Sequence, residues 1–304
     1  MDALVRAVVL AALALVSSGC GVKTIYNHMD RLILWGVDDL VTLDQTQERY
    51  LKSEVDAVLY WHRTTQLPLY ARGLERVADQ LDRGASLEDL LATEEMVNGW
   101  ADAIGEQTNP VAAELLYSMK DAQLTELAAG LDANNEKWLK PYRDMNAQER
   151  AEKWTKEYVD LLENFTPRLN ANERALVQRR SAGYVSDDAA WLDYRKRWQR
   201  ELLDRVRAHD GFERFSLEYA DMSNHRERWY GDNYQKILDS NASLYRTVTL
   251  EILQMLGDER RRKLTAKLRS FAQDFDELAA DAPPTPPTVT VCLVSCGAGA
   301  AVGA

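Results

Sequence analysis

The stretch that decides the fold is residues 44–66, DQTQERYLKSEVDAVLYWHRTTQ. Its apolar side chains recur at intervals of three or four residues, which is the period of one helix face. That stripe holds Tyr50, Val55, Val58, Leu59 and His62. The polar residues Gln47, Arg49, Lys52 and Glu54 lie largely outside it. The pattern predicts an amphipathic helix with one face in a core.

The same periodicity extends over most of the chain and predicts helices at 27–41, 44–66, 68–83, 86–107, 110–140, 146–164, 168–182, 186–209, 212–222, 225–256 and 258–280. Proline positions set several of these limits. Pro68 is expected to kink or divide a long helix, Pro141 to end one, and Pro110 and Pro167 to open helices. Glycines 84, 130, 183, 211 and 257 are expected at helix ends. The prediction is an all-α, elongated multi-helix bundle or array over residues 27–281.

Three segments share a pattern in which Asp or Asn is followed three residues later by Gln or Glu. They begin at Asp44, Asn146 and Asn170, and residues 256–260 are a more degraded copy. This spacing is typical of capping boxes at helix N-termini. The segments also resemble, in five residues at a time, the Leu-Thr-x-x-Gln motif of small periplasmic stress chaperones, with Thr replaced in every copy. That resemblance implies a curved helical surface that holds unfolded clients.

The first twenty residues are typical of an export signal. Arg6 precedes an apolar stretch at residues 7–16, which is too short to span a bilayer, and Ser-Ser-Gly at 17–19 leads into Cys20. This arrangement resembles the lipobox of bacterial lipoproteins, although Ser17 stands where Leu is usual. The resemblance implies a cleaved signal peptide at 1–19, lipid on Cys20 and a tether at 20–26, with Gly21 compatible with the outer membrane. The alternative is a buried N-terminal helix that ends in Gly-Cys.

Charge and cysteine usage agree with an exported protein. The formal net charge of −11 argues against nucleic acid and against a protein surface that binds anionic lipid. No second stretch is long and apolar enough to span a membrane, so we expect the lipid to be the anchor. Cys292 and Cys296 lie in a tail, 282–304, that starts with a Pro-rich linker. We expect this tail to be flexible, with a docking strand as the alternative, and its cysteines to form a local disulfide or to remain thiols.

Sequence motifs for chemistry are almost absent. We expect no catalytic residues, no metal site and no cofactor, because the four histidines are scattered and no nucleophile elbow or phosphate loop occurs. Trp61, His62 and Arg63 form the polar triplet that best fits a functional site. His62 is expected to be a core histidine, and the alternative is that the triplet contacts a ligand or partner. Asp221 and His225, one turn apart, are expected to pair. The eight tryptophans are expected mostly in the core, with a sugar- or peptide-binding surface as the alternative.

A wider resemblance covers nearly the whole chain after Cys20. Tyr26-Asn27, Trp35, Asp38-Asp39 and the run from Trp61 to Ala71 resemble an uncharacterised family of helical proteobacterial lipoproteins of unknown function. The resemblance implies an envelope protein held by lipid on Cys20, on the outer membrane and facing the periplasm. We therefore expect a non-catalytic binding, scaffold or chaperone-like module, with an envelope protein or an unfolded client as partner. The alternative is an envelope enzyme that acts on peptidoglycan or another glycan.

Overall fold

The computed structural model describes residues 19–208, 210–289 and 291–294, with the side chains of Gly19 and Cys20 excepted. These residues form helices without a strand, which confirms the predicted all-α class. The helices are α2 (Gly19–Tyr26), α3 (Met29–Asp38), α4 (Gln45–Trp61), α5 (Leu67–Asp82), α6 (Leu87–Tyr117), α7 (Asp121–Leu139), α8 (Ala147–Phe165), α9 (Ala171–Arg180), α10 (Asp188–Ala208), α11 (Phe212–Asn224), α12 (Asp232–Met255) and α13 (Asp258–Ala280). A π turn, η1 (His62–Gln66), joins α4 to α5, and η2 (Ser181–Gly183) and η3 (Arg226–Trp229) are short 3₁₀ turns.

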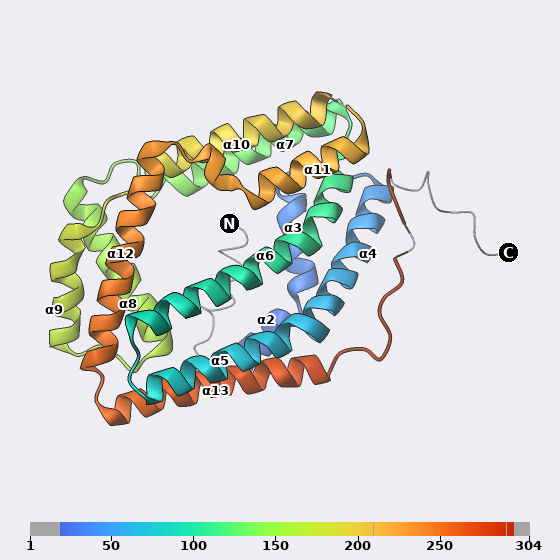
Figure 1. Cartoon of the computed structure of the whole chain (residues 1–304). Coiled ribbons are helices and arrows are strands. Elements are labelled where there is room, and N and C mark those ends of the chain that lie inside the picture. Colours follow the sequence, from blue (N-terminus) through green and yellow to red (C-terminus); the bar gives the residue numbers. More distant parts are fainter. Residues whose placement is uncertain (1–18, 209, 290, 295–304) are drawn as a thin grey trace.

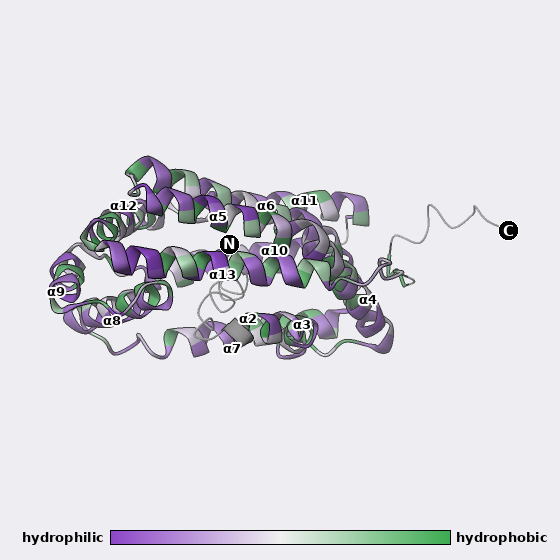
Figure 2. Cartoon of the chain, turned by 90° about the horizontal axis from the view of Figure 1, so that it is seen from below, coloured by the Kyte–Doolittle hydropathy of each residue, from purple (hydrophilic) through white to green (hydrophobic). Residues whose placement is uncertain are grey.

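The helices form an elongated open array in which α6 runs obliquely across the middle (Figure 1). Helices α5 and α13 lie antiparallel along one side, α8, α9 and α12 form one end, and α7 and α10 run along the opposite side. The main core joins α4, α6, α7, α10 and α11, and smaller apolar clusters lie between α8, α9 and α12 and between α5 and α13. Polar and apolar residues alternate along the exposed helices, as Figure 2 shows for α13.

The capping boxes are confirmed at all three predicted positions. The side chains of Asp44, Asn146 and Asn170 each accept hydrogen bonds from first-turn amides. Three residues later, the side chains of Gln47, Glu149 and Glu173 accept a hydrogen bond from the backbone amide of the cap residue. The degraded copy at 256–260 differs, because Gly257 precedes α13 without a side-chain cap. Local hydrogen bonding therefore accounts for the repeated pattern without a shared ligand.

The predicted break at Asn109-Pro110 is wrong, because α6 continues through Pro110 to Tyr117. Proline costs one backbone hydrogen bond there, but the following turns bury Ala113 and Leu115 in the main core. The chain breaks instead at residues 118–120, where Gln123 Oε1 accepts a hydrogen bond from the Lys120 amide at 3.1 Å. Tertiary burial thus outweighs the local signal.

The predicted position of one glycine and the predicted start of one helix also differ from the structure. Gly130 lies inside α7 rather than at its end, and a Cβ there would stand 2.5 Å from the carbonyl oxygen of Leu40. The helix expected to start at 225 starts at Asp232, because Gly231 adopts a φ of +61° that ends the preceding turn. Gln47, placed outside the apolar stripe, is 2 % exposed because its amide bonds to Ser118 and Gln123.

Both ends of the described chain contact the helical body. Residues 20–26, expected from the sequence to be a tether, lie in α2, and Val22 packs against Phe271 of α13. At the other end Val291 and Leu293 pack against the main core, without forming a strand. Cys292 is disulfide-bonded, and Cys296 lies outside the described residues. The expected signal peptide also lies largely outside them.

Candidate functional site

The triplet Trp61-His62-Arg63 lies where α4 passes into η1. Leu67 donates its amide hydrogen to the carbonyl of His62, five residues back, which widens the helix just before Pro68. Pro68 has no amide hydrogen, and a wider turn gives its ring room. The hydroxyls of Thr64 and Thr65 donate to the carbonyls of Tyr60 and Trp61 at 2.8 and 2.7 Å. The π turn, predicted only as a kink, sets the directions of His62 and Arg63.

His62 is largely enclosed by aromatic rings from three different segments. Its Nδ1 lies 2.9 Å from the Tyr26 hydroxyl, and the two rings stack with centroids 5.7 Å apart. Tyr70 meets the imidazole edge-on at 5.3 Å, and Trp61 does so at 6.3 Å. Burial lowers the pKa of His62 from 6.5 to about 4, so the imidazole is neutral at pH 7.

Arg63 holds the same N-terminal segment from the other side. Its guanidinium donates to Asn27 Oδ1 at 2.7 Å and lies 5.1 Å from the centre of the Tyr26 ring. Burial raises the pKa of Tyr26 to about 12, and the charge of Arg63 opposes that rise. The Tyr26 phenol is therefore neutral and is available as a hydrogen-bond donor to His62.

Helix α2 is fixed to α13 as well. Lys23 Nζ lies 3.2 Å from Asp274 Oδ1 and also pairs with Glu277. The hydrogen bond to Glu277 raises the pKa of Lys23 most, and the bond to Asp274 adds to this effect. The residues that join the N-terminal segment to η1 and α13 form what we call the N-terminal clamp. Its members are Val22, Lys23, Tyr26, Asn27, His62, Arg63, Phe271, Asp274 and Glu277.

The clamp extends inward as a row of aromatic side chains. Tyr70 lies 4.4 Å from Trp100 and 6.2 Å from Phe275, measured between ring centres. Gly73 admits the Trp100 ring, since a Cβ at that position would stand 2.4 Å from Trp100 Cζ2. Within the described part of the chain, Gln66 Oε1, Tyr70 OH and Asp274 Oδ2 are buried without a hydrogen-bond partner. The clamp therefore offers hydrogen bonding and stacking.

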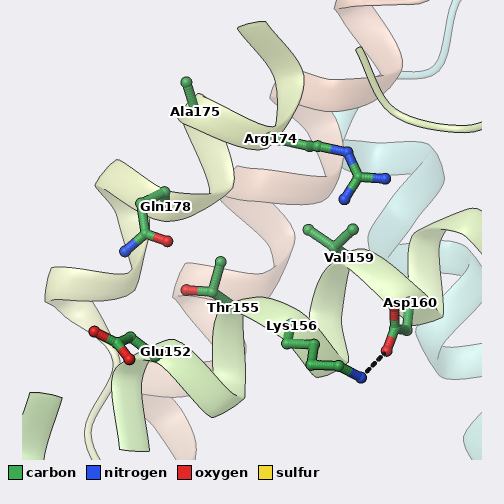
Figure 3. Close-up of a pocket in the computed structure, with 8 residues that line it drawn as sticks. All are labelled: Glu152, Thr155, Lys156, Val159, Asp160, Arg174, Ala175 and Gln178. Atoms are coloured by element: carbon green, nitrogen blue, oxygen red, sulfur yellow. Dashed lines mark hydrogen bonds and ion pairs between the residues drawn. The ribbon is translucent and has the colours of Figure 1, made fainter. Parts of the chain in front are cut away.

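A surface hollow lies between α8 and α9 (Figure 3). Its floor includes Val159, and its rim carries Lys156, which pairs with Asp160 at 2.8 Å. Arg174 reaches over it from α9 and pairs with Glu163. The residues that line the hollow include no aromatic side chain, and its charged side chains bind one another or neighbouring residues.

A narrow aromatic pocket lies between α7, α8 and α10. Its aromatic lining consists of Trp138, Tyr142, Trp154 and Tyr184. Three carboxylates border it, of which Asp188 pairs with Arg150 and Glu157 pairs with Lys153. Asp187 accepts a hydrogen bond from the Tyr184 hydroxyl at 3.4 Å. Aromatic rings and carboxylates are the residue types that typically bind a glycan. In this pocket each of the three carboxylates is already bonded to a neighbouring side chain.

His225 lies near two carboxylates outside the clamp. Within the described ranges no three His, Cys, Asp or Glu side chains are grouped to hold a metal. His225 lies 3.8 Å from Asp221, which agrees with the predicted pairing, and 3.4 Å from Glu227. Glu218, one turn before Asp221 on α11, binds Arg205 and Arg214. Of the helices that the structure describes, none has the length and apolar character needed to cross a membrane.

Sequence patterns pointed to His62 and Arg63, but not to their partners. The structure places both against the chain's own N-terminal segment, and the prediction of an external ligand stays a prediction. Lys23 and Asp274 are 251 positions apart, and no sequence signal connects them. Cys20 lies in the first turn of α2, and its side chain is outside the described set, so its lipidation remains a prediction.

The fold and the clamp define an all-helical protein whose N-terminal helix is fixed to its body. The chain belongs to a family of unknown function, DUF6279, whose model matches residues 39–235. The matched span contains His62 and Arg63, whereas α2 and α13 lie outside it. Comparisons with curated proteins and with solved structures give no match.

Proposed function

We propose that this protein is a lipid-anchored helical binding or scaffold module of the bacterial cell envelope, attached through Cys20 to the outer membrane and facing the periplasm. The observation that carries the proposal is the N-terminal clamp. Cys20 lies three residues before Lys23, which pairs with Asp274 at 3.2 Å. A lipid on Cys20 would thus be joined to a docked helix, and the helical body would have a restricted orientation at the membrane.

The charge distribution supports a lipid rather than a protein surface as the anchor. The chain has a formal net charge of −11, which disfavours contact with anionic lipid headgroups. Stable anchoring by acyl chains needs more than one chain, as bacterial N-terminal acylation supplies. The protein body then remains in water and presents its helices to a partner.

The anchor is tested by Cys20→Ser in the full chain, followed by membrane fractionation with a high-salt wash. We expect the wild-type protein in the membrane fraction and the variant in the soluble fraction, with equal helix content by circular dichroism. Ala12→Ser, inside the apolar stretch, is the matched control and should stay with the membrane. A variant that still sediments after the wash would overturn the proposal.

The holding role has its own test. The purified C20S protein is added to a reduced, aggregating client, and light scattering is followed. A binding module of the chaperone type should suppress scattering at a few-fold excess. Unchanged scattering at tenfold excess would exclude unfolded clients and leave a scaffold that binds a folded envelope protein.

The aromatic pocket supports one alternative, an enzyme or binder that acts on an envelope glycan. Trp138 and Tyr142 stack with centroids 5.2 Å apart at its edge, and sugar rings bind to such faces. Binding to peptidoglycan is measured by co-sedimentation, with Trp138→Ala as the test and the exposed Trp35→Ala as the control. Selective loss in W138A would favour the glycan, and release of sugar fragments would indicate an enzyme.

A further inference from the structure

The chain's C-terminal segment returns to the body after an exposed linker. Residues 283–286 and Thr288 and Val289 are exposed, whereas residues 291–294 are half-buried. In Figure 1 the segment leaves α13 and runs beside α4. We call residues 291–294 the strap. The change from exposed to half-buried shows that the strap, rather than the linker, makes the contact.

The strap is held through its backbone by one buried carboxylate. Glu114 Oε1, near the end of α6, accepts hydrogen bonds from the amides of Leu293 and Val294 at 2.7 and 2.9 Å. Glu114 is only 8 % exposed. Charge-assisted bonds to a buried carboxylate are stronger than bonds between neutral groups. Since they engage the peptide backbone, they are available to other segments that bend so that two consecutive amide hydrogens point the same way.

The charge of Glu114 acts on two neighbouring groups. Burial raises the pKa of Tyr50 on α4, and the Glu114 charge adds to that effect. Burial also raises the pKa of Glu54, again with a contribution from Glu114. A surface with this charge favours hydrogen-bond donors and disfavours segments that carry carboxylates.

Two apolar side chains of the strap contact the body. Val291 and Leu293 pack against the main core cluster, and the chain bends at Leu293 and Val294, which lets both amides reach one carboxylate oxygen. The surface that receives them is therefore apolar, with a backbone-binding carboxylate at its edge. This combination suits a short apolar segment that bends at the carboxylate.

We propose that Glu114 and the adjoining apolar surface form a binding site for a short, apolar, uncharged peptide segment that bends at Glu114, and that the strap is its displaceable resident. A client segment of that chemistry would take the place of Leu293 and Val294 on Glu114. The proposal deepens the proposed binding role by naming the class of partner, and it is independent of the lipid anchor.

The test uses a fluorescent peptide with the sequence of residues 288–297, carrying C292S and C296S. It is titrated into the full chain and into Leu293→Asp, whose new charge beside Glu114 should expel the strap. Binding to L293D should be at least tenfold tighter than to the wild type. Adding Glu114→Gln to L293D should weaken binding at least fivefold, because the peptide amides lose a charged acceptor. Circular dichroism of each variant checks that the helices remain.

A second peptide makes the result independent of variant folding. It carries Pro at the positions of Leu293 and Val294 and so has no amide hydrogens there. This proline peptide should bind neither the wild type nor L293D. If it binds as tightly as the first peptide, the interaction is nonspecific apolar contact and the proposal is overturned. Equal affinity of wild type and L293D would show a permanent structural strap. A wild-type dimer that L293D converts to a monomer would identify a second copy as the occupant. A negative result in any of these leaves the C20S fractionation unaffected.

Discussion

The properties of His62 follow from a proline six residues later in the chain. Pro68 favours the wider turn, the turn directs the imidazole toward Tyr26 and Tyr70, and the surrounding rings keep it neutral. The apolar period of residues 44–66 predicted an inward-facing His62. It could not predict Tyr26 as the partner, because that contact depends on how α2 docks.

His62 should make folding stability depend on pH. Its pKa is lowered to about 4 in the folded protein, whereas an unfolded imidazole titrates near 6.5. Stability is therefore retained above pH 6.5 and falls as the pH drops toward 4, since the unfolded chain gains the proton first. The loss between pH 7 and pH 5 should reach up to about 2 kcal/mol.

Urea unfolding at pH 7 and pH 5 measures this effect. His62→Asn keeps an acceptor near Nδ1 but cannot titrate, so its stability should fall less between the two pH values. The exposed His28→Asn is the control and should follow the wild type. Parallel behaviour of all three proteins would show that His62 does not contribute to the pH dependence.

Two glycines inside helices should respond in opposite directions to alanine. At Gly130 a Cβ would meet the Leu40 backbone at 2.5 Å, so Gly130→Ala must separate α7 from the chain after α3. We expect a loss of about 1–3 kcal/mol, typical of overpacking. At Gly99 nothing lies within 4 Å, so Gly99→Ala should add about 0.5–1 kcal/mol by helix propensity. Thermal denaturation compares them, and a destabilised G99A would contradict this assignment.

At the scale of elements, the capping boxes show what a local pattern can and cannot predict. Asp44, Asn146 and Asn170 are all at the N-termini of helices, as predicted, because the required hydrogen bonds join residues three apart. The pattern does not distinguish exposed from buried copies. Glu149 is exposed, whereas Glu173 is fully buried and pairs with Arg260, which belongs to the degraded copy.

This difference gives a matched pair of variants at the same position of two caps. Glu149→Ala removes an exposed cap bond and should cost about 0.5–1 kcal/mol. Glu173→Ala leaves the Arg260 guanidinium without its buried partner and should cost about 3–5 kcal/mol. Chemical denaturation measures both, and equal losses would mean that the Glu173–Arg260 pair adds nothing to the cap.

At the scale of the whole molecule, helix content was predictable and assembly was not. Amphipathic periods identify most helices, since each face is encoded within a few turns. The break after Tyr117 instead of before Pro110 depends on what α6 packs against. The contacts of α2 with α13, and of the strap with Glu114, join segments more than 170 positions apart. Neither involves a motif, so only the three-dimensional arrangement reveals that both ends of the described chain bind the body.

The coupling of α2 to the body should depend on the charge of Lys23. Lys23→Glu would place a negative charge beside Asp274 and Glu277, so α2 should detach while α13 stays packed on α5. Hydrogen exchange in the C20S background should show lost protection in residues 21–26 and unchanged protection in α13. Asp274→Lys combined with K23E restores an opposite pair and should recover protection. If K23E leaves α2 protected, then Val22 and Tyr26 suffice to hold the helix, and the Lys23 ion pairs are not what fixes α2 to the body.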